Sequence, residues 1–273
     1  MTLQEKIQES LALIRKGERL ALAMNPTDGY IVGFSGGKDS QALLELVHMA
    51  GVKHRAYYSV TTNDPPENVY FIRRSYPEIE FIHPKRNFFK IVEAKGLPTM
   101  KSRFCCQELK EGIGVGSVVL TGVRADESRN RANYPEVKVY SRRKEHKDGK
   151  ARNIEEIEAN EHRCIKGKDK LMVYPLLHWT ETEVWEFLKE RGIPTNPCYE
   201  VTGRVGCMFC PYSRKGQIAY YEETYPKFKE HIMASLRVFW DKHQEHILQS
   251  PEEYYQWWKS KKSIKQFRKV VEK

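Results

Sequence analysis

The chain has 273 residues, of which 40 % are hydrophobic, and a formal net charge of +10. This composition suits a protein with one substantial core, and no apolar run approaches the roughly 18 residues that a transmembrane helix needs. Six cysteines are too few for a disulfide scaffold, so we expect a cytoplasmic protein whose clustered cysteines serve metal or redox chemistry. The charge favours an anionic partner such as a nucleotide, phosphate or nucleic acid.

The first 120 residues alternate β-rich and helical segments. An amphipathic helical segment is expected over residues 1–27, and helical segments then separate the apolar runs YIVGF, HRAYYSV, IEFIHP and GSVVLTGV. Strands separated by helices favour a parallel sheet with helices on both faces. The sequence therefore predicts a Rossmann-like three-layer α/β/α domain with a mostly parallel sheet at residues 28–212.

Two later regions depart from this alternation. Residues 134–170 contain the run SRRKEHKDGKAR and are predicted to form a charged loop. Residues 213–273 are predicted to be a helical, aromatic and basic C-terminal extension.

A glycine pair follows the first predicted strand in the stretch IVGFSGGKDSQALLELV. It is not a Walker A loop, because Val32 stands where that motif has glycine and Asp39 where it has Ser or Thr. A strand, a glycine turn and a helix start still form an anion site, since backbone N–H groups and the helix dipole face the ligand. The hydroxyl groups of Ser35 and Ser40 and the charge of Lys38 would add to it, and Asp39 would brace the loop or help to hold magnesium.

The stretch FSGGKDS resembles the pyrophosphate-binding loop of the adenine-nucleotide α-hydrolase (PP-loop) superfamily, whose members cleave ATP between its α and β phosphates. The further stretches RFCCQELK, LTGVRADESRNRA, YPLLHWTETEVWEFLKERGIPTNPCYE and GRVGCMFCP occur in the order found in the phosphoadenosine phosphosulfate (PAPS) reductase family. The resemblance covers roughly residues 28–215 and points to an iron–sulfur-type member.

The resemblance implies a site for ATP with magnesium. The residues that the resemblance implies for nucleotide binding are Ser35, Gly36, Gly37, Lys38, Asp39, Ser40, Gly122, Arg124 and Arg131. Catalysis falls to Lys38, Asp39 and Arg124. Arginine suits this role because its guanidinium group matches phosphate or sulfate oxygens, although a solvated loop in which Arg124, Arg129 and Arg131 pair with local acids is the alternative.

Five cysteines are candidate metal ligands. Cys207 and Cys210 form C-x-x-C, Cys105 and Cys106 are adjacent, and Cys198 lies upstream of the C-x-x-C. Iron–sulfur members of the family hold a 4Fe–4S cluster with a C-C pair and a distal C-x-x-C, which implies that four of these five thiols hold a cluster here. Zinc and unmetallated core thiols are the alternatives, and Cys164 is expected to be incidental.

The last cysteine is Cys210, whereas the assimilatory reductases of this family carry a nucleophilic cysteine in a C-terminal motif. The complete SGGKDS loop instead favours an enzyme that binds ATP, adenylates an oxygen and acts in thiolation of nucleic acid or a small molecule. The alternatives are an APS or PAPS reductase or ATP sulfurylase-like enzyme, and a non-catalytic nucleotide-sensing or nucleic-acid-binding module.

The C-terminal region carries aromatic residues before a basic tail, in EEYYQWWKSKKSIKQFRKVVEK. Aromatic faces beside cations suit RNA or single-stranded DNA. The alternative is an amphipathic helix whose aromatic residues dock on the core and whose lysines face water. We also expect a homo-oligomer and no membrane partner.

Overall fold

The computed structural model describes residues 1–140, 154, 170–214, 216–243 and 248–271. The chain forms two compact units. The sheet unit comprises Met1–Ser59, Pro66–Ile82 and Gly112–Val205, and the helical unit comprises Val60–Pro65, His83–Glu111 and Gly206–Lys273. Three stretches that the sequence placed within the α/β domain, residues 60–65, 83–111 and 206–212, are grouped with the C-terminal helices.

The sheet unit contains one six-stranded sheet of order β3-β2-β1-β4-β6-β5. Its strands are β1 (Tyr30–Phe34), β2 (His54–Ser59), β3 (Glu80–Ile82), β4 (Val118–Leu120), β5 (Val137–Tyr140) and β6 (Lys170–Val173). Every neighbouring pair is parallel except β5 with β6. The predicted mostly parallel α/β fold is confirmed.

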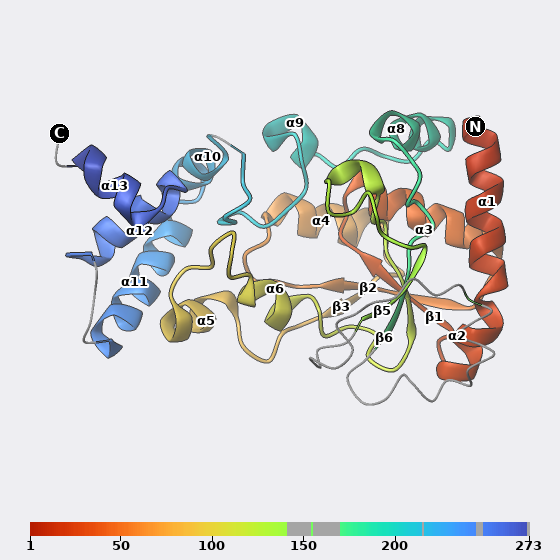
Figure 1. Ribbon diagram of the computed structural model, residues 1–273, viewed down its shortest axis with the longest axis horizontal. Helices are drawn as coiled ribbons and strands as arrows, with labels where there is room; N and C mark the ends of the chain where they lie inside the picture. Colours follow the sequence, from red (N-terminus) through yellow and green to blue (C-terminus); the bar gives the residue numbers. More distant parts are fainter. Residues whose placement is uncertain (141–153, 155–169, 215, 244–247, 272–273) are drawn as a thin grey trace. The chain divides into compact units, whose positions relative to one another are not determined.

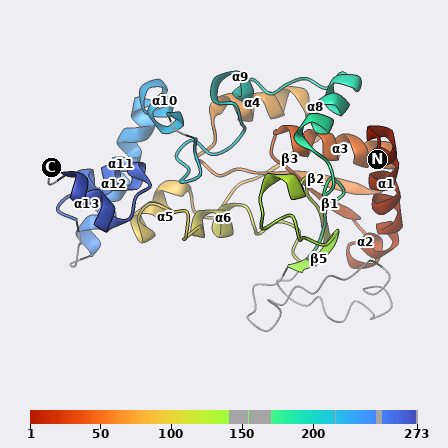
Figure 2. The same cartoon turned by 45° about the horizontal axis from the view of Figure 1, so that its top comes forward.

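Helices cover both sides of this sheet. They are α1 (Leu3–Lys16), α2 (Glu18–Met24), α3 (Lys38–Ala50), α4 (Pro66–Ser75), α8 (Glu181–Glu190) and the short α9 (Cys198–Thr202). Figure 1 shows α3, α4 and α8 above the strands and α2 below β1, and Figure 2 agrees. Cover on both sides explains why the central β1 is apolar along its length and almost wholly buried.

Two helices of the sheet unit begin with a capping box. Thr2 and Glu5 exchange hydrogen bonds at the start of α1, and Thr180 and Glu183 do so at the start of α8. Each pair satisfies backbone N–H groups that the first helical turn leaves without partners. Both helices pack against α3, so these local signals hold the elements around the glycine loop.

The predicted charged loop at 134–170 begins later than expected. Residues 137–140 form β5, which pairs antiparallel with β6. The prediction was wrong here because a four-residue strand with charged neighbours has no distinctive local pattern, and only its partner strand satisfies its backbone groups. Residues 141–153 and 155–169, with Cys164, lie outside the described residues.

The helical unit contains α5 (Phe88–Lys95), α6 (Phe104–Leu109), α10 (Gln217–Thr224), α11 (Pro226–Lys242), α12 (Pro251–Ser260) and α13 (Ile264–Val271). Helix α11 packs on α5 and α12 around a core that includes the buried side chains of Tyr255 and Trp258. Tyr254 and Trp257 pack against the same core while remaining partly exposed. The C-terminal aromatic residues therefore dock on a core, as in the alternative to a nucleic-acid surface.

Candidate nucleotide-binding site and cysteine cluster

The glycine loop joins the carboxyl end of β1 to the first turn of α3. Gly36 has φ +76°, in the left-handed region, and a Cβ there would lie 2.4 Å from Asn68 Oδ1, so only glycine fits. Gly37 is the N-cap of α3 and supplies no side-chain cap. The first turn of a buried helix therefore presents backbone N–H groups and positive potential at the end of a central strand, an arrangement that suits an anion.

The two serines of the loop brace its turn. Ser35 N–H donates to Ser40 Oγ over 3.1 Å, and Ser40 Oγ–H donates to the Gly37 carbonyl oxygen over 2.8 Å. The hydroxyl of Ser40 therefore bonds to the loop itself. Both serines occupy the predicted site, and their observed bonds preform the loop conformation.

Lys38, Asp39 and Arg124 form one ionic group beside the loop. Asp39 Oδ1 accepts from Arg124 Nε at 2.6 Å, and Asp39 Oδ2 accepts from Lys38 Nζ at 3.0 Å. Arg124 is only 3 % exposed. Burial opposes its charge, but the Asp39 carboxylate outweighs that effect and raises the pKa of Arg124. Two cations are thus held next to an anion site, and Asp39 uses both oxygens as a brace.

Gly122 allows the segment after β4 to approach α3. A Cβ at this position would lie 2.6 Å from the backbone oxygen of Asp39. The preceding residue, Thr121, has a buried hydroxyl without a hydrogen-bond partner among the described residues. A buried polar atom without a partner at the carboxyl end of a parallel strand is suited to hydrogen-bond a ligand.

Three further residues hold the loop, two of them at its carbonyl oxygens and one at an N–H group. Asn196 Nδ2 donates to the Gly36 carbonyl oxygen over 2.9 Å and to Asn68 Oδ1 over 2.7 Å, and Asn68 Nδ2 donates to the Ser35 carbonyl oxygen over 3.2 Å. Binding these carbonyl oxygens leaves the opposite side of the loop to its N–H groups. The third, Tyr199 of α9, accepts the Lys38 N–H at its hydroxyl over 2.9 Å.

Burial raises the pKa of Tyr199 to about 12, so its hydroxyl remains neutral and able to exchange hydrogen bonds at neutral pH. Tyr199 and Asn196 both lie in the stretch PTNPCYE, which belongs to a motif that resembles the family. The resemblance itself implies no role for either residue.

The hydrogen bonds of Arg131 connect it to the glycine loop indirectly, through Glu127. It pairs with Glu127, whose carboxylate also accepts the backbone N–H of Arg124 at 3.0 Å. Arg129 is exposed. Of the three arginines in RADESRNR, the structure brings Arg124 to the loop and joins Arg131 to it only through Glu127.

Four of the five candidate thiols line one small cavity of the helical unit. Cys105 and Cys106 come from α6, and Cys207 and Cys210 from the segment before α10. Asn63 holds that segment, because its carbonyl oxygen accepts the Met208 N–H over 2.8 Å and its side chain bonds to the backbone of Phe209. The C-C pair and the C-x-x-C therefore meet.

Charge in this cavity favours the thiolate of Cys106. The Cys105 thiol donates to Cys106, and Arg103 lies 3.6 Å from the Cys106 sulfur, which together lower the pKa of Cys106 to about 5 while the pKa of Cys105 rises. Cys207 raises the pKa of Lys110 and so keeps that ammonium charged. Four such thiols suit zinc or an iron–sulfur cluster as donors. Within the described part of the chain, however, no group of three or more His, Cys, Asp or Glu already has a geometry that could hold a metal ion.

Cys198 does not line this cavity. It belongs to α9 in the sheet unit, is 4 % exposed, and donates its backbone N–H to Asn196 Oδ1 over 3.0 Å. Burial raises the pKa of its thiol to about 11, which disfavours the thiolate that a metal needs.

None of the helices among the described residues is long and apolar enough to cross a membrane.

Comparison with known proteins places this site in a family. The model of the phosphoadenosine phosphosulfate reductase domain matches residues 29–213. An uncharacterised protein of Methanocaldococcus jannaschii is 23 % identical over 279 residues, covering 98 % of this chain and 61 % of that protein. Sulfate adenylyltransferase subunit 2 of Pseudomonas putida is 28 % identical over 189 residues, covering 63 % of this chain and 60 % of the subunit. The chain thus spans less than two thirds of the length of these curated relatives.

Among solved structures, phosphoadenylyl-sulfate reductase from Candida auris, in a phosphate complex, aligns with a TM-score of 0.47 at 15 % identity. The alignment covers 76 % of this chain and 95 % of that one. The matched domain contains the glycine loop, Arg124 and all the cysteines named above, and it spans more than half of the chain. The chain belongs to the phosphoadenosine phosphosulfate reductase domain family.

Proposed function

We propose that this protein binds ATP with magnesium, cleaves it between the α and β phosphates, and transfers the adenylyl group to an oxygen of an acceptor with release of pyrophosphate. One observation carries the proposal. The complete SGGKDS loop leads into helix α3, whose N-terminus has no side-chain cap. Lys38 and Arg124 lie beside the loop, each hydrogen-bonded to one carboxylate oxygen of Asp39. This arrangement supplies both an anion site and cations for a polyanionic leaving group.

Each group has a role in that reaction. Backbone N–H groups of the loop bind the β and γ phosphates, while Lys38 and Arg124 stabilise the charge that grows on the departing pyrophosphate. Asp39 positions both cations before ATP arrives. The Lys38 N–H now bonds to Tyr199, so a phosphate oxygen that takes this N–H displaces the phenol, which then donates its own O–H to the phosphate.

The cysteine cavity supports a second part of the proposal. Cys105, Cys106, Cys207 and Cys210 would hold a 4Fe–4S cluster, with zinc as the alternative, once their side chains turn toward a common centre. Such a cluster supplies either structural support or sulfur for thiolation of a nucleic acid or a small molecule. The hydrogen bond from Cys105 and the neighbouring Arg103 favour the thiolate form of Cys106, the form in which a thiol binds a metal.

A second candidate function is transfer of the adenylyl group to sulfate. The observation in its favour is the similarity to sulfate adenylyltransferase subunit 2. Sulfate would be the oxygen acceptor at the same loop, so the first half of the reaction is shared. The cysteine set distinguishes the two candidates, because adenylation of sulfate has no need of a thiolate-held cluster.

The first test is product analysis with MgATP and radiolabel at the α phosphate. We expect AMP or an adenylylated acceptor together with pyrophosphate, and formation of ADP and phosphate would contradict α,β cleavage. Lys38→Met and Arg124→Gln should each lower turnover by about 100-fold or more, as loss of a preorganised charge does. Arg191→Gln is the matched control, because Arg191 pairs with Glu45 on the surface of the same unit.

Acceptors are then compared under the same conditions. Stimulation by sulfate would favour the second candidate, and stimulation by RNA or DNA with a sulfur source would favour thiolation. Sulfite formed from APS or PAPS with a thiol reductant would show a reductase instead. Binding of ATP without any turnover in the presence of these acceptors would favour a nucleotide sensor.

A further inference from the structure

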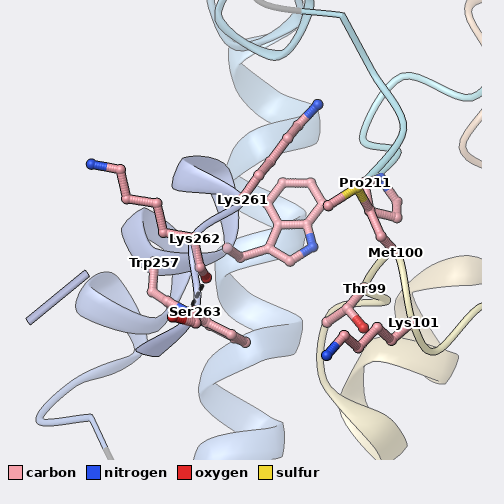
Figure 3. A pocket seen from close by; sticks show the side chains of 9 residues that line it. Thr99, Met100, Lys101, Pro211, Trp257, Lys261, Lys262 and Ser263 are labelled. Carbon is pink, nitrogen blue, oxygen red and sulfur yellow. Dashed lines mark hydrogen bonds between the residues drawn. The ribbon is translucent and has the colours of Figure 1, made fainter. Parts of the chain in front are cut away.

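A pocket in the helical unit belongs to neither the glycine loop nor the cysteine cavity. Its volume is about 320 Å³, within the range of about 300–1,000 Å³ of small-molecule sites. Figure 3 shows Thr99, Met100 and Lys101 facing Trp257, Lys261, Lys262 and Ser263, with Pro211 at its upper edge. Trp258 completes the lining.

The apolar walls of this pocket are held by hydrogen bonds at their edges. Trp258 Nε1 donates to the Pro98 carbonyl oxygen over 2.6 Å, and Trp257 Nε1 donates to the Lys262 carbonyl oxygen over 3.0 Å. Tyr212 donates its hydroxyl to the Met100 carbonyl oxygen over 2.8 Å. These bonds use the ring edges and the backbone, so they fix the pocket walls without covering the faces of the side chains. Trp257 remains partly exposed and Met100 remains exposed.

Only one sign of charge lines the pocket. Lys101, Lys261 and Lys262 are exposed, and no Asp or Glu is among the lining residues. Lys261 reaches the Ser213 carbonyl oxygen, whereas Lys101 and Lys262 make no ion pair among the described residues. Three ammonium groups around an aromatic wall complement a ligand that is flat, apolar on its faces and negatively charged at its edge.

We propose that this pocket binds one nucleotide of a single-stranded nucleic acid, with the base against the tryptophan and methionine side chains and the flanking phosphates on the lysines. Stacking of bases on aromatic side chains within a cationic surface is the general means of binding single strands. A strand fits better than a free nucleotide, because further Lys and Arg residues follow the lining lysines along the sequence. From Lys259 onward the sequence has seven Lys or Arg and one acid, including the exposed Lys265 of α13.

The binding step stands apart from ATP chemistry, and the inference rests on the proposed function only where the bound strand is taken as the acceptor. All lining residues belong to the helical unit and none to the glycine loop. Loss of strand binding and loss of pyrophosphate release are therefore separate measurements on the same full-length protein.

The test is fluorescence anisotropy with labelled oligothymidylate and oligouridylate of about 12 nucleotides, a length within the range of single-strand sites. The variant Lys101→Gln/Lys262→Gln should weaken binding by about tenfold at moderate salt and reduce the slope of log K against log salt by about 1.4, because two phosphate contacts are lost. Trp257→Leu keeps an apolar side chain and should weaken binding by about tenfold through loss of stacking.

The matched control is Lys85→Gln/Lys227→Gln, which removes the same charge from exposed positions of the helical unit outside the pocket. Thermal unfolding of each variant checks that it is folded. Equal weakening by the control and pocket variants would overturn the proposal in favour of a generally basic surface. Unchanged binding in Trp257→Leu, or competition by free UMP as strong as by the oligonucleotide, would overturn it as well.

Discussion

At the scale of single residues, Arg124 and Asp39 have the most demanding environment near the loop. Arg124 is 3 % exposed and depends on the carboxylate of Asp39, which is itself only partly exposed. Asp126 also pairs with Arg124, at 3.2 Å, but its side chain is largely exposed. Removing the Asp39 carboxylate therefore leaves the buried guanidinium only partly compensated, which costs more than the pair contributes. The pair therefore constrains stability as well as the proposed chemistry.

Asp39→Asn should lower the free energy of unfolding by about 2–4 kcal/mol, because the amide no longer compensates the buried guanidinium. Urea denaturation at neutral pH measures this difference. Glu45→Gln is the matched control: it breaks the surface pair with Arg191 and should cost less than about 1 kcal/mol. Equal losses in the two variants would show that Arg124 does not depend on Asp39.

The cysteines give a second residue-scale prediction. Protein purified without oxygen should contain about four irons and four sulfides per chain if the four cavity thiols hold a cluster. Cys207→Ser should lose this metal, whereas Cys198→Ser should retain it, since Cys198 lies outside the cavity. Elemental analysis together with the absorbance spectrum measures the metal content of each variant. One zinc per chain in place of iron would contradict the prediction of an iron–sulfur cluster.

At the scale of elements, Gly122 sets how closely the segment after β4 approaches the start of α3. A Cβ would meet the Asp39 backbone oxygen at 2.6 Å, and backbone cannot move aside as a flexible side chain does. Gly122→Ala should destabilise the protein by about 1–3 kcal/mol and weaken ATP binding, because it displaces the braced loop. Gly112→Ala is the control, since a Cβ there meets nothing within 4 Å. Urea denaturation and ATP titration compare the two, and equal stability and affinity would contradict this packing.

Glu222 links three helices of the helical unit. It lies on α10 and pairs with Lys229 of α11 at 3.3 Å and Lys259 of α12 at 2.9 Å. Burial alone would raise the pKa of Glu222, but the hydrogen bond from Lys259 outweighs it and the pKa is lowered. A carboxyl group with a lowered folded-state pKa stabilises the protein above its unfolded pKa, and this contribution disappears as the pH falls through the folded value.

Glu222→Gln should therefore lower the melting temperature at pH 7 by a few degrees, as a loss of about 1 kcal/mol does, and the gap from wild type should narrow toward pH 3. Glu223→Gln is the control, because Glu223 is exposed and forms no ion pair among the described residues. Melting curves from pH 3 to pH 7 test this; a gap independent of pH would show that packing and not charge explains the loss.

At the scale of the whole molecule, the two proposed ligand sites draw on different units. The loop and Arg124 belong to the sheet unit, and the pocket of Figure 3 to the helical unit. A ligand that binds only the native state slows hydrogen exchange most strongly in the elements that it contacts. The two ligands should therefore protect separate parts of the chain.

Hydrogen–deuterium exchange should show protection of residues 35–40 and 122–124 by MgATP, and of residues 99–101 and 257–263 by an oligonucleotide. Lys38→Met should abolish the first pattern and keep the second. Protection of the glycine loop by the oligonucleotide alone would contradict separate sites.

Much of this molecule follows from local sequence. A strand, the turn SGGKDS and a helix occupy adjacent positions, so the glycine loop is visible in about 20 residues, and regular alternation indicates the parallel sheet. The C-C and C-x-x-C spacings likewise marked candidate thiols, although only contacts between distant segments bring four of the five candidates into one cavity. Local backbone preference and hydrophobic period decide the loop and the sheet, which is why sequence alone determined them.

Tertiary structure decided what lies around them. The bond from Lys38 to Tyr199 spans 161 positions and that from Asn196 to Asn68 spans 128, and neither phenol nor amide has a local pattern that marks it as part of the loop. Strand β5 was missed and Cys198 proved to lie outside the cavity for the same reason. Contacts between distant segments depend on which buried polar groups find partners once the chain is packed, and this is a property of the folded chain as a whole.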